Sequence, residues 1–172
     1  MTDLDDRHQQ LQLRRPAGRA TLSSMSLVEE FGAGKSGIEQ LRALIASGRR
    51  PGIAVSLDFT LLEVDEGTAV FGGTPGQHAY NPIGIVHGGY AATLLDSACG
   101  CAVHTRLKAG QSYSTLELKV AYHKAITDQT GPMRAEGRIV TMGRRVGFAE
   151  GRLVDVSGKL YASATSTLLV LE

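Results

Sequence analysis

The sequence predicts one α+β domain, in which a single long helix packs against an antiparallel sheet of about six strands. Two observations lead to this prediction. A chain of 172 residues is long enough for one domain with a sizeable core. Segments in which apolar residues alternate flank one long segment with helical periodicity, and short turns join most of them. Short connections pair neighbouring strands in antiparallel order.

The elements follow in order from their periodicity. The helix that begins at Gly88 has small apolar side chains along its length, so another element must pack closely against it. One helix on one face leaves the other face and the edges of the sheet free, and dimerisation would cover them. The expected elements are a helix over 36–46, strands over 53–61 and 68–74, a loop over 75–86, the long helix from Gly88, and strands near 114–122, 133–141, 145–156 and 160–171.

Residues 1–35 differ from the remainder of the chain. They lack sustained apolar periodicity, so we expect a mobile N-terminal tail followed by a single domain over 36–172. The stretch Gly34-Lys35-Ser36 matches the last three residues of the phosphate-binding loop motif. That motif needs another glycine five positions before Gly34, where the chain has Glu29, and we reject this interpretation.

The composition is that of a soluble globular protein, with 42% hydrophobic and 20% charged residues. Lys and Arg total 18 against 17 for Asp and Glu, which gives a formal net charge of +1. Nucleic-acid binding rests on a surplus of cations, so we expect no nucleic-acid partner. The chain shows no basic-then-apolar leader and no apolar run of about 20 residues, so we expect no membrane association and a cytoplasmic location.

The junction His87-Gly88-Gly89 lies where the loop becomes the long helix. The first N–H groups of a helix lack partners within the helix, and the helix dipole adds positive potential there. Glycine lets a ligand approach such an amide, which can polarise a carbonyl and stabilise an oxyanion. Alternatively, the two glycines only permit a tight turn and His87 is an ordinary neighbour of the helix cap.

Asp96 is the second candidate, because it lies on this helix among Leu94, Leu95 and Ala98. A carboxylate in such a segment either has a structural role, in which it hydrogen-bonds to polar groups of a neighbouring element, or it takes part in catalysis. On a helix, Asp96 lies roughly 13 Å beyond His87 and points to the opposite face. Both residues can therefore serve one reaction only if two copies of the chain meet.

The run from Asn81 to Asp96, N-P-x-G-x-x-H-G-G-x-x-x-x-L-x-D, resembles the signature of hotdog-fold acyl-CoA thioesterases of the phenylacetate-degradation (PaaI-like) type. The resemblance extends from about Ile53 to Leu171. It includes the strand over 114–122 and the hairpin over 140–146. It implies a hotdog fold, in which the antiparallel sheet wraps around one long helix. It also implies a homodimer with two equivalent active sites at its interface, and the joining of two dimers into a tetramer.

The resemblance also implies roles for the matching residues. The N–H of Gly88 polarises the thioester carbonyl, and Asp96 activates water or attacks directly at a site formed with the other subunit. Asn81 helps to hold the carbonyl or the water. Aspartate at position 96, where related subgroups have glutamate, favours the phenylacetate type over the hydroxybenzoyl type. The other matching residues are His87, which braces the loop and assists near the thioester oxygen, and Thr115, whose hydroxyl orients the carboxylate, with Ser114 as the rival for that role. Gly89 and Ser114 are expected to contact substrate.

The predicted function is therefore hydrolysis of an acyl- or arylacetyl-CoA to the free acid and coenzyme A. Thioester hydrolysis needs no metal, and we expect no metal and no cofactor beyond the coenzyme A of the substrate. A non-catalytic acyl-CoA-binding hotdog protein and a hotdog acyl-thioester dehydratase or hydratase are the alternatives. Arg144 and Arg145 are candidates for binding the phosphates of coenzyme A. Two arginines in a turn are equally expected in a solvent-exposed loop that binds no ligand. Lys124 and Arg106 are the other candidates.

Overall fold

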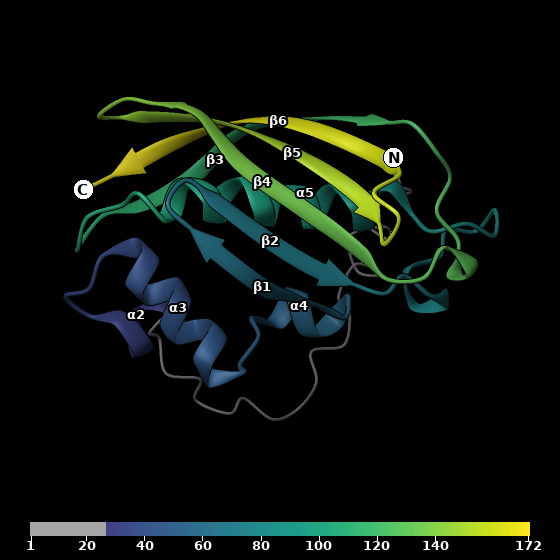
Figure 1. Cartoon of the computed structure of the whole chain (residues 1–172), viewed down its shortest axis with the longest axis horizontal. Coiled ribbons are helices and arrows are strands. Elements are labelled where there is room, and N and C mark those ends of the chain that lie inside the picture. Colours follow the sequence, from purple (N-terminus) through teal and green to yellow (C-terminus); the bar gives the residue numbers. More distant parts are fainter. Residues whose placement is uncertain (1–26) are drawn as a thin grey trace, which may run out of the picture.

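The computed structural model describes residues 27–172 and shows a six-stranded antiparallel sheet curled around one long helix, α5 (Gly88–His104) (Figure 1). This is the predicted α+β hotdog arrangement. The strands are β1 (Phe59–Asp65), β2 (Thr68–Gly73), β3 (Ser112–Tyr122), β4 (Met133–Met142), β5 (Val146–Asp155) and β6 (Leu160–Leu171). They lie in the order β1-β2-β4-β5-β6-β3, so β1 and β3 form the two edges.

Short helices precede the sheet in the chain and lie on the side of β1 (Figure 1). They are α2 (Leu27–Gly32), α3 (Gly37–Ser47) and α4 (Gly52–Ser56), and the 3₁₀ turns η1 (Gln77–Ala79) and η2 (Asp128–Thr130) follow later. The helix α3 agrees with the prediction, whereas α2 falls within the segment assigned to the tail. Residues 1–26 of that segment lie outside the described part of the chain.

The predicted strand over 53–61 is wrong in its first half. Pro51 caps α4 with φ of −64°, and Ile53 and Val55, whose alternation suggested a half-buried strand, are 54% and 55% exposed. Ala54 between them is the buried residue, at 1% exposure. Asp58 then adopts a left-handed φ of 50°, and the strand begins only at Phe59. A proline-initiated helical turn thus took the place of the expected extended chain.

The helix α5 packs closely against β4 and β5, as its small side chains predicted. Leu94, Leu95 and Ala98 are fully buried between helix and sheet. A Cβ atom at Gly137 of β4 would collide with the backbone of Ala98, so only glycine permits this approach. The close contact fixes the orientation of α5, and hence the direction in which Asp96 leaves the helix.

The first turn of α3 is joined to the last turn of α5 by a buried polar pair. The side-chain amide of Gln40 donates to the carbonyl oxygens of Gly32 and Lys35, so its oxygen is left to accept from Nε2 of His104 at 2.8 Å. Burial lowers the pKa of His104 to about 4, which keeps the ring neutral near pH 7. The pair holds α3 beside α5.

The strand β3 is the longer of the two edges, with 11 residues. It pairs with β6 on one side, and no other strand within residues 27–172 pairs with its outer side. Unpaired N–H and C=O groups along such an edge favour pairing with another chain. In the same described range, no helix is long and apolar enough to cross a membrane.

Candidate active site

His87 caps the N-terminus of α5. Its Nδ1 accepts a hydrogen bond from the N–H of Gly89 at 2.8 Å, so the neutral ring carries its proton on Nε2. The amide of Gly89 is therefore occupied, and Gly89 is left to contact substrate only through its Cα. The N–H of Gly88, in contrast, donates to no acceptor in the described part of the chain. It is the amide that the sequence singled out as the donor to a thioester carbonyl.

The loop that carries Asn81 is joined by hydrogen bonds to the start of α5. The side-chain oxygen of Asn81 accepts from the N–H groups of Ile83 and Ile85, at 3.1 and 3.3 Å. Because this oxygen is occupied, the Nδ2 group, with two N–H donors, is the part of the side chain left for a ligand. The N–H of His87 in turn donates to the carbonyl of Ala79, which ties the loop to the helix junction.

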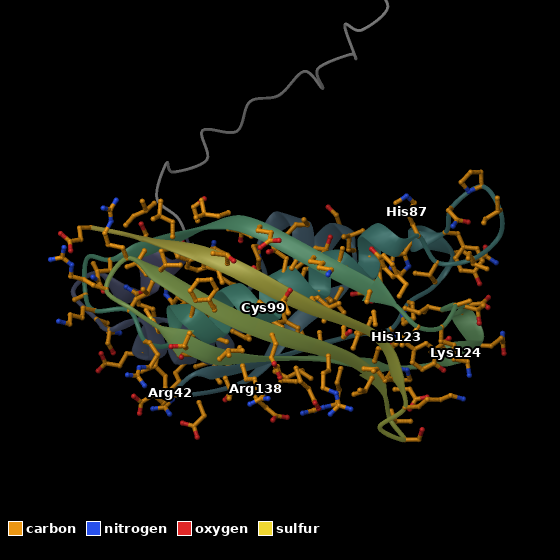
Figure 2. The ribbon with its side chains drawn as sticks, turned by 90° about the horizontal axis from the view of Figure 1, so that it is seen from above. Arg42, His87, Cys99, His123, Lys124 and Arg138 are labelled. Atoms are coloured by element: carbon orange, nitrogen blue, oxygen red, sulfur yellow. The ribbon has the colours of Figure 1, made fainter. Side chains whose placement is uncertain are left out.

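Tyr122 is a contact of Gly88 that the sequence did not reveal. Its hydroxyl donates to the carbonyl oxygen of Gly88 at 3.0 Å, and a Cβ atom at Gly88 would lie 3.1 Å from the tyrosine ring. The alternation of β3 could place Tyr122 on the inner face, but not against a residue 34 positions earlier. In Figure 2, His123 and Lys124, just after β3, lie at the same end of the molecule as His87.

Asp96 and Thr115 form the second half of the candidate site. The hydroxyl of Thr115 donates to Oδ1 of Asp96 at 3.1 Å, and both side chains are half-buried. Ser114, the rival for this position, is exposed and makes no hydrogen bond to Asp96. The remaining carboxylate oxygen, Oδ2, accepts no hydrogen bond from any residue in 27–172.

The two halves lie apart within one chain. Asp96 lies eight positions after Gly88 on the continuous helix α5, which corresponds to a rise of about 12 Å. A single carbonyl group cannot contact the amide of Gly88 and the carboxylate of Asp96 in the same copy. Gly88 and His87 therefore lie at the start of α5, where the bond from the His87 N–H to Ala79 ties the Asn81 loop, and Asp96 with Thr115 lies further along the helix.

Arg144 and Arg145 are exposed in the turn between β4 and β5 and form no ion pair with any described residue. The carbonyl of Arg145 accepts from the N–H of Val170, and Val170 pairs with Tyr113 of β3. The hairpin thus lies at the end of the sheet where β3 begins, on the side of Thr115. The other two basic candidates are engaged, because Arg106 pairs with Glu66 at 3.0 Å and Lys124 lies over the ring of Tyr161.

Metal ligation has no support within residues 27–172, where no three His, Cys, Asp or Glu side chains gather in a group that could hold a metal ion.

Comparison with known proteins gives a consistent result. The sequence profile of the thioesterase superfamily matches residues 83–162. A protein of Halobacterium salinarum, provisionally named an esterase, is 39% identical over 84 residues, which are 48% of this chain and 54% of that protein. The chain thus matches about half the length of this curated relative.

Two solved structures resemble about three quarters of this chain. One is a phenylacetic acid degradation-related protein of Ralstonia eutropha, provisionally named a thioesterase, with 30% identity and a TM-score of 0.67 over 75% of this chain and 97% of that chain. The other is a conserved protein of Pseudomonas aeruginosa, with 25% identity and a TM-score of 0.66 over 71% of this chain and 95% of that chain.

The helix wrapped by an antiparallel sheet, with two separated clusters of polar groups along it, defines a protein of the hotdog class. The profile and the Ralstonia structure identify the family within that class: the chain belongs to the thioesterase superfamily.

Proposed function

We propose that the protein is a homo-oligomeric acyl-CoA thioesterase, which hydrolyses an acyl- or arylacetyl-CoA to the free acid and coenzyme A. The observation that carries this proposal is the division of one set of hydrolytic groups between the N-terminus and the middle of α5. An unpaired helix N-terminal amide lies at one end, and an oriented carboxylate lies about 12 Å away. Two copies of the chain can complete both sites.

The edge strand β3 supports this assembly. It runs beside α5 from Tyr113, whose hydroxyl lies against Gly100, to Tyr122, whose hydroxyl bonds to Gly88. Antiparallel pairing of two β3 edges places the Thr115 end of one strand beside the Tyr122 end of the other. The carboxylate of Asp96 then faces the second copy's Gly88, and the two-fold axis creates two such sites. Joining of two dimers into a tetramer is part of the same proposal.

The chemistry follows from the groups at each half-site. The N–H of Gly88 and the Nδ2 of Asn81 donate to the thioester oxygen as negative charge develops on it. Thr115 holds Oδ1 of Asp96, so Oδ2 is free to take a proton from water while the water oxygen attacks the carbonyl carbon. The carbon–sulfur bond then breaks, and the thiolate of coenzyme A leaves with the electron pair and is protonated. Arg144 and Arg145 are proposed to contact its phosphates.

The alternatives are a hotdog dehydratase or hydratase and a non-catalytic acyl-CoA-binding protein. A dehydratase needs a histidine free to act as the base, whereas Nδ1 of His87 is used to cap α5. A binding protein has no need for a hydroxyl that orients a half-buried carboxylate. Both observations favour the hydrolase.

The test is release of free thiol from a panel of acyl-CoAs, with hydration of a 2-enoyl-CoA measured in parallel. The proposal expects thiol release by the wild-type protein and a loss of at least about 100-fold in kcat for Asp96→Asn, which keeps the size of the side chain. Hydration without thiol release would show a hydratase, and tight binding without either reaction would show a binding protein.

A further inference from the structure

Thr115 and Tyr122 both reach α5 from the edge strand β3, although regular strand geometry does not permit this. The hydroxyl of Thr115 donates to Asp96, and the hydroxyl of Tyr122 donates to the carbonyl oxygen of Gly88. The two residues lie seven positions apart in one strand. In a regular strand, successive side chains point to opposite faces, so residues an odd number of positions apart cannot share a face. The alternation must therefore change between them.

A β-bulge at Leu116 makes this change. Thr115 lies opposite Leu168 of β6. Leu118, three positions further along β3, lies opposite Ser166, which is only two positions from Leu168 on β6. The strand β3 thus contains one extra residue in this stretch. Leu116 has no partner on β6, and its side chain is 60% exposed.

The extra residue shifts the alternation along the rest of β3. Before the bulge, Tyr113 packs on the core, and Thr115 faces α5 on the same side. After the bulge, Leu118 and Val120 pack on the core, and Tyr122 faces the same way. The inward residues are odd-numbered before Leu116 and even-numbered after it. Without the bulge, only one of the two hydroxyls could reach the helix.

The bulge is held from β6 by Ser166. This residue is buried, at 3% exposure, and its hydroxyl donates to the main-chain carbonyl oxygen of Glu117 at 2.8 Å. A bulge disrupts the hydrogen-bond ladder locally, and a partly buried carbonyl there needs another donor. The neighbouring hydroxyl, that of Thr167, donates to Oε2 of the Glu117 side chain at 3.2 Å. The residue that follows Leu116 is therefore bound by two hydroxyls of β6.

We propose that Ser166 is a positioning residue for thioester hydrolysis. It keeps Leu116 as the bulged residue, and it thereby keeps both Thr115 and Tyr122 turned towards α5. This inference rests on the proposed thioesterase function. Each shared site takes Asp96 from one copy and Gly88 from the other, so the bulges of both copies act on every site.

The experiment begins with Ser166→Ala, which removes the hydroxyl and adds no volume. We expect kcat for thiol release to fall at least about threefold, because the bulge loses one hydrogen bond. KM should stay within about twofold, since Ser166 acts through Thr115 and Tyr122 and not on the binding of coenzyme A. Thr165→Val is the matched control, because Thr165 is an exposed residue of β6 opposite Lys119, where the pairing is regular. This control should keep the kcat of the wild type.

A mutant cycle separates a positioning role from a general loss of stability. The background is Thr115→Val/Tyr122→Phe, which lacks both contacts with α5. In this background, Ser166→Ala should change kcat by less than about twofold, because the residues through which it acts no longer contribute. The proposal is overturned if Ser166→Ala alone keeps the kcat of the wild type. It is also overturned if Ser166→Ala lowers kcat by the same factor in both backgrounds.

If the wild-type protein hydrolyses no thioester, the proposed function fails, and crystal structures of the wild type and Ser166→Ala still test the role of Ser166 in the bulge. We expect the hydroxyl of Thr115 to bond to Asp96 in the wild type and to lie beyond hydrogen-bond distance of it in the variant. The same contact in both structures would contradict the inference.

Discussion

Replacing Thr115 by valine removes the hydroxyl that donates to Asp96 and keeps the shape of the side chain. The bond is 3.1 Å long and ends on a carboxylate in a half-buried position. Hydrogen bonds to charged groups contribute about 1.5–3 kcal/mol, and partial exposure to solvent reduces this to about 1–2 kcal/mol. If the bond orients the carboxylate during the reaction, kcat falls by about 5- to 30-fold.

The assay is thiol release at saturating acyl-CoA, with circular dichroism to confirm folding. Thr115→Ser keeps the donor and retains most of the activity. Ser114→Ala is the matched control, because Ser114 is the neighbouring hydroxyl on β3, is exposed, and makes no hydrogen bond to Asp96. The reasoning is refuted if Thr115→Val turns over like the wild type, or if Ser114→Ala is the variant that loses activity.

Other substitutions test the remaining contacts. Tyr122→Phe removes the hydrogen bond to the carbonyl of Gly88. It should lower kcat severalfold and leave the thermal unfolding midpoint nearly unchanged. A kcat equal to that of the wild type would show that this hydroxyl has no part in the reaction. The double variant Arg144→Ala/Arg145→Ala should raise KM and leave kcat nearly unchanged, and an unchanged KM would identify the hairpin as a solvated turn. Burial lowers the pKa of His104 from 6.5 to about 4, so protons bind preferentially to the unfolded chain between these values. The free energy of unfolding should fall as pH drops from 6.5 towards 4, by about 3 kcal/mol from this residue, and chemical denaturation of His104→Gln should lack this part of the decline.

Much of the fold could be predicted because its elements are long and locally coded. The small-residue stripe of α5 and the short turns of the β4–β5–β6 meander fix helix, strands and antiparallel order. The segment over 53–58 could not be read correctly, since Ile53 and Val55 alternate like strand residues but point to solvent around a buried Ala54. Whether an alternating apolar residue is buried depends on what packs against it, and sequence periodicity carries no information on that.

The candidate site divides in the same way. Gly88 could be located from the glycine junction at the start of a helix, and Asp96 from a carboxylate among apolar helix residues. Helix geometry then gave the separation between them. The choice between Thr115 and Ser114 depends on which side chains of β3 face α5. This strand contains a bulge between Thr115 and Glu117, which the sequence pattern does not indicate. The contact of Tyr122 with Gly88 likewise depends on how β3 crosses α5. The spacing of Gly88 and Asp96 on one helix was predictable, whereas the register of β3 and the contact of Tyr122 with Gly88 were not.

The most direct test of the central claim is activity in mixed dimers. Asp96→Ala and Asn81→Ala each inactivate the shared site, and their subunits are allowed to exchange in equal amounts. In a mixed dimer one site inherits both defects and the other inherits neither, and random pairing makes about half of the dimers mixed, so activity should return to about a quarter of the wild-type value. Mixing Asp96→Ala with Asp96→Asn, in which every site keeps a defect, should restore nothing. If the first mixture also stays at the level of its parents after exchange is demonstrated, each site lies within one chain and the account is contradicted.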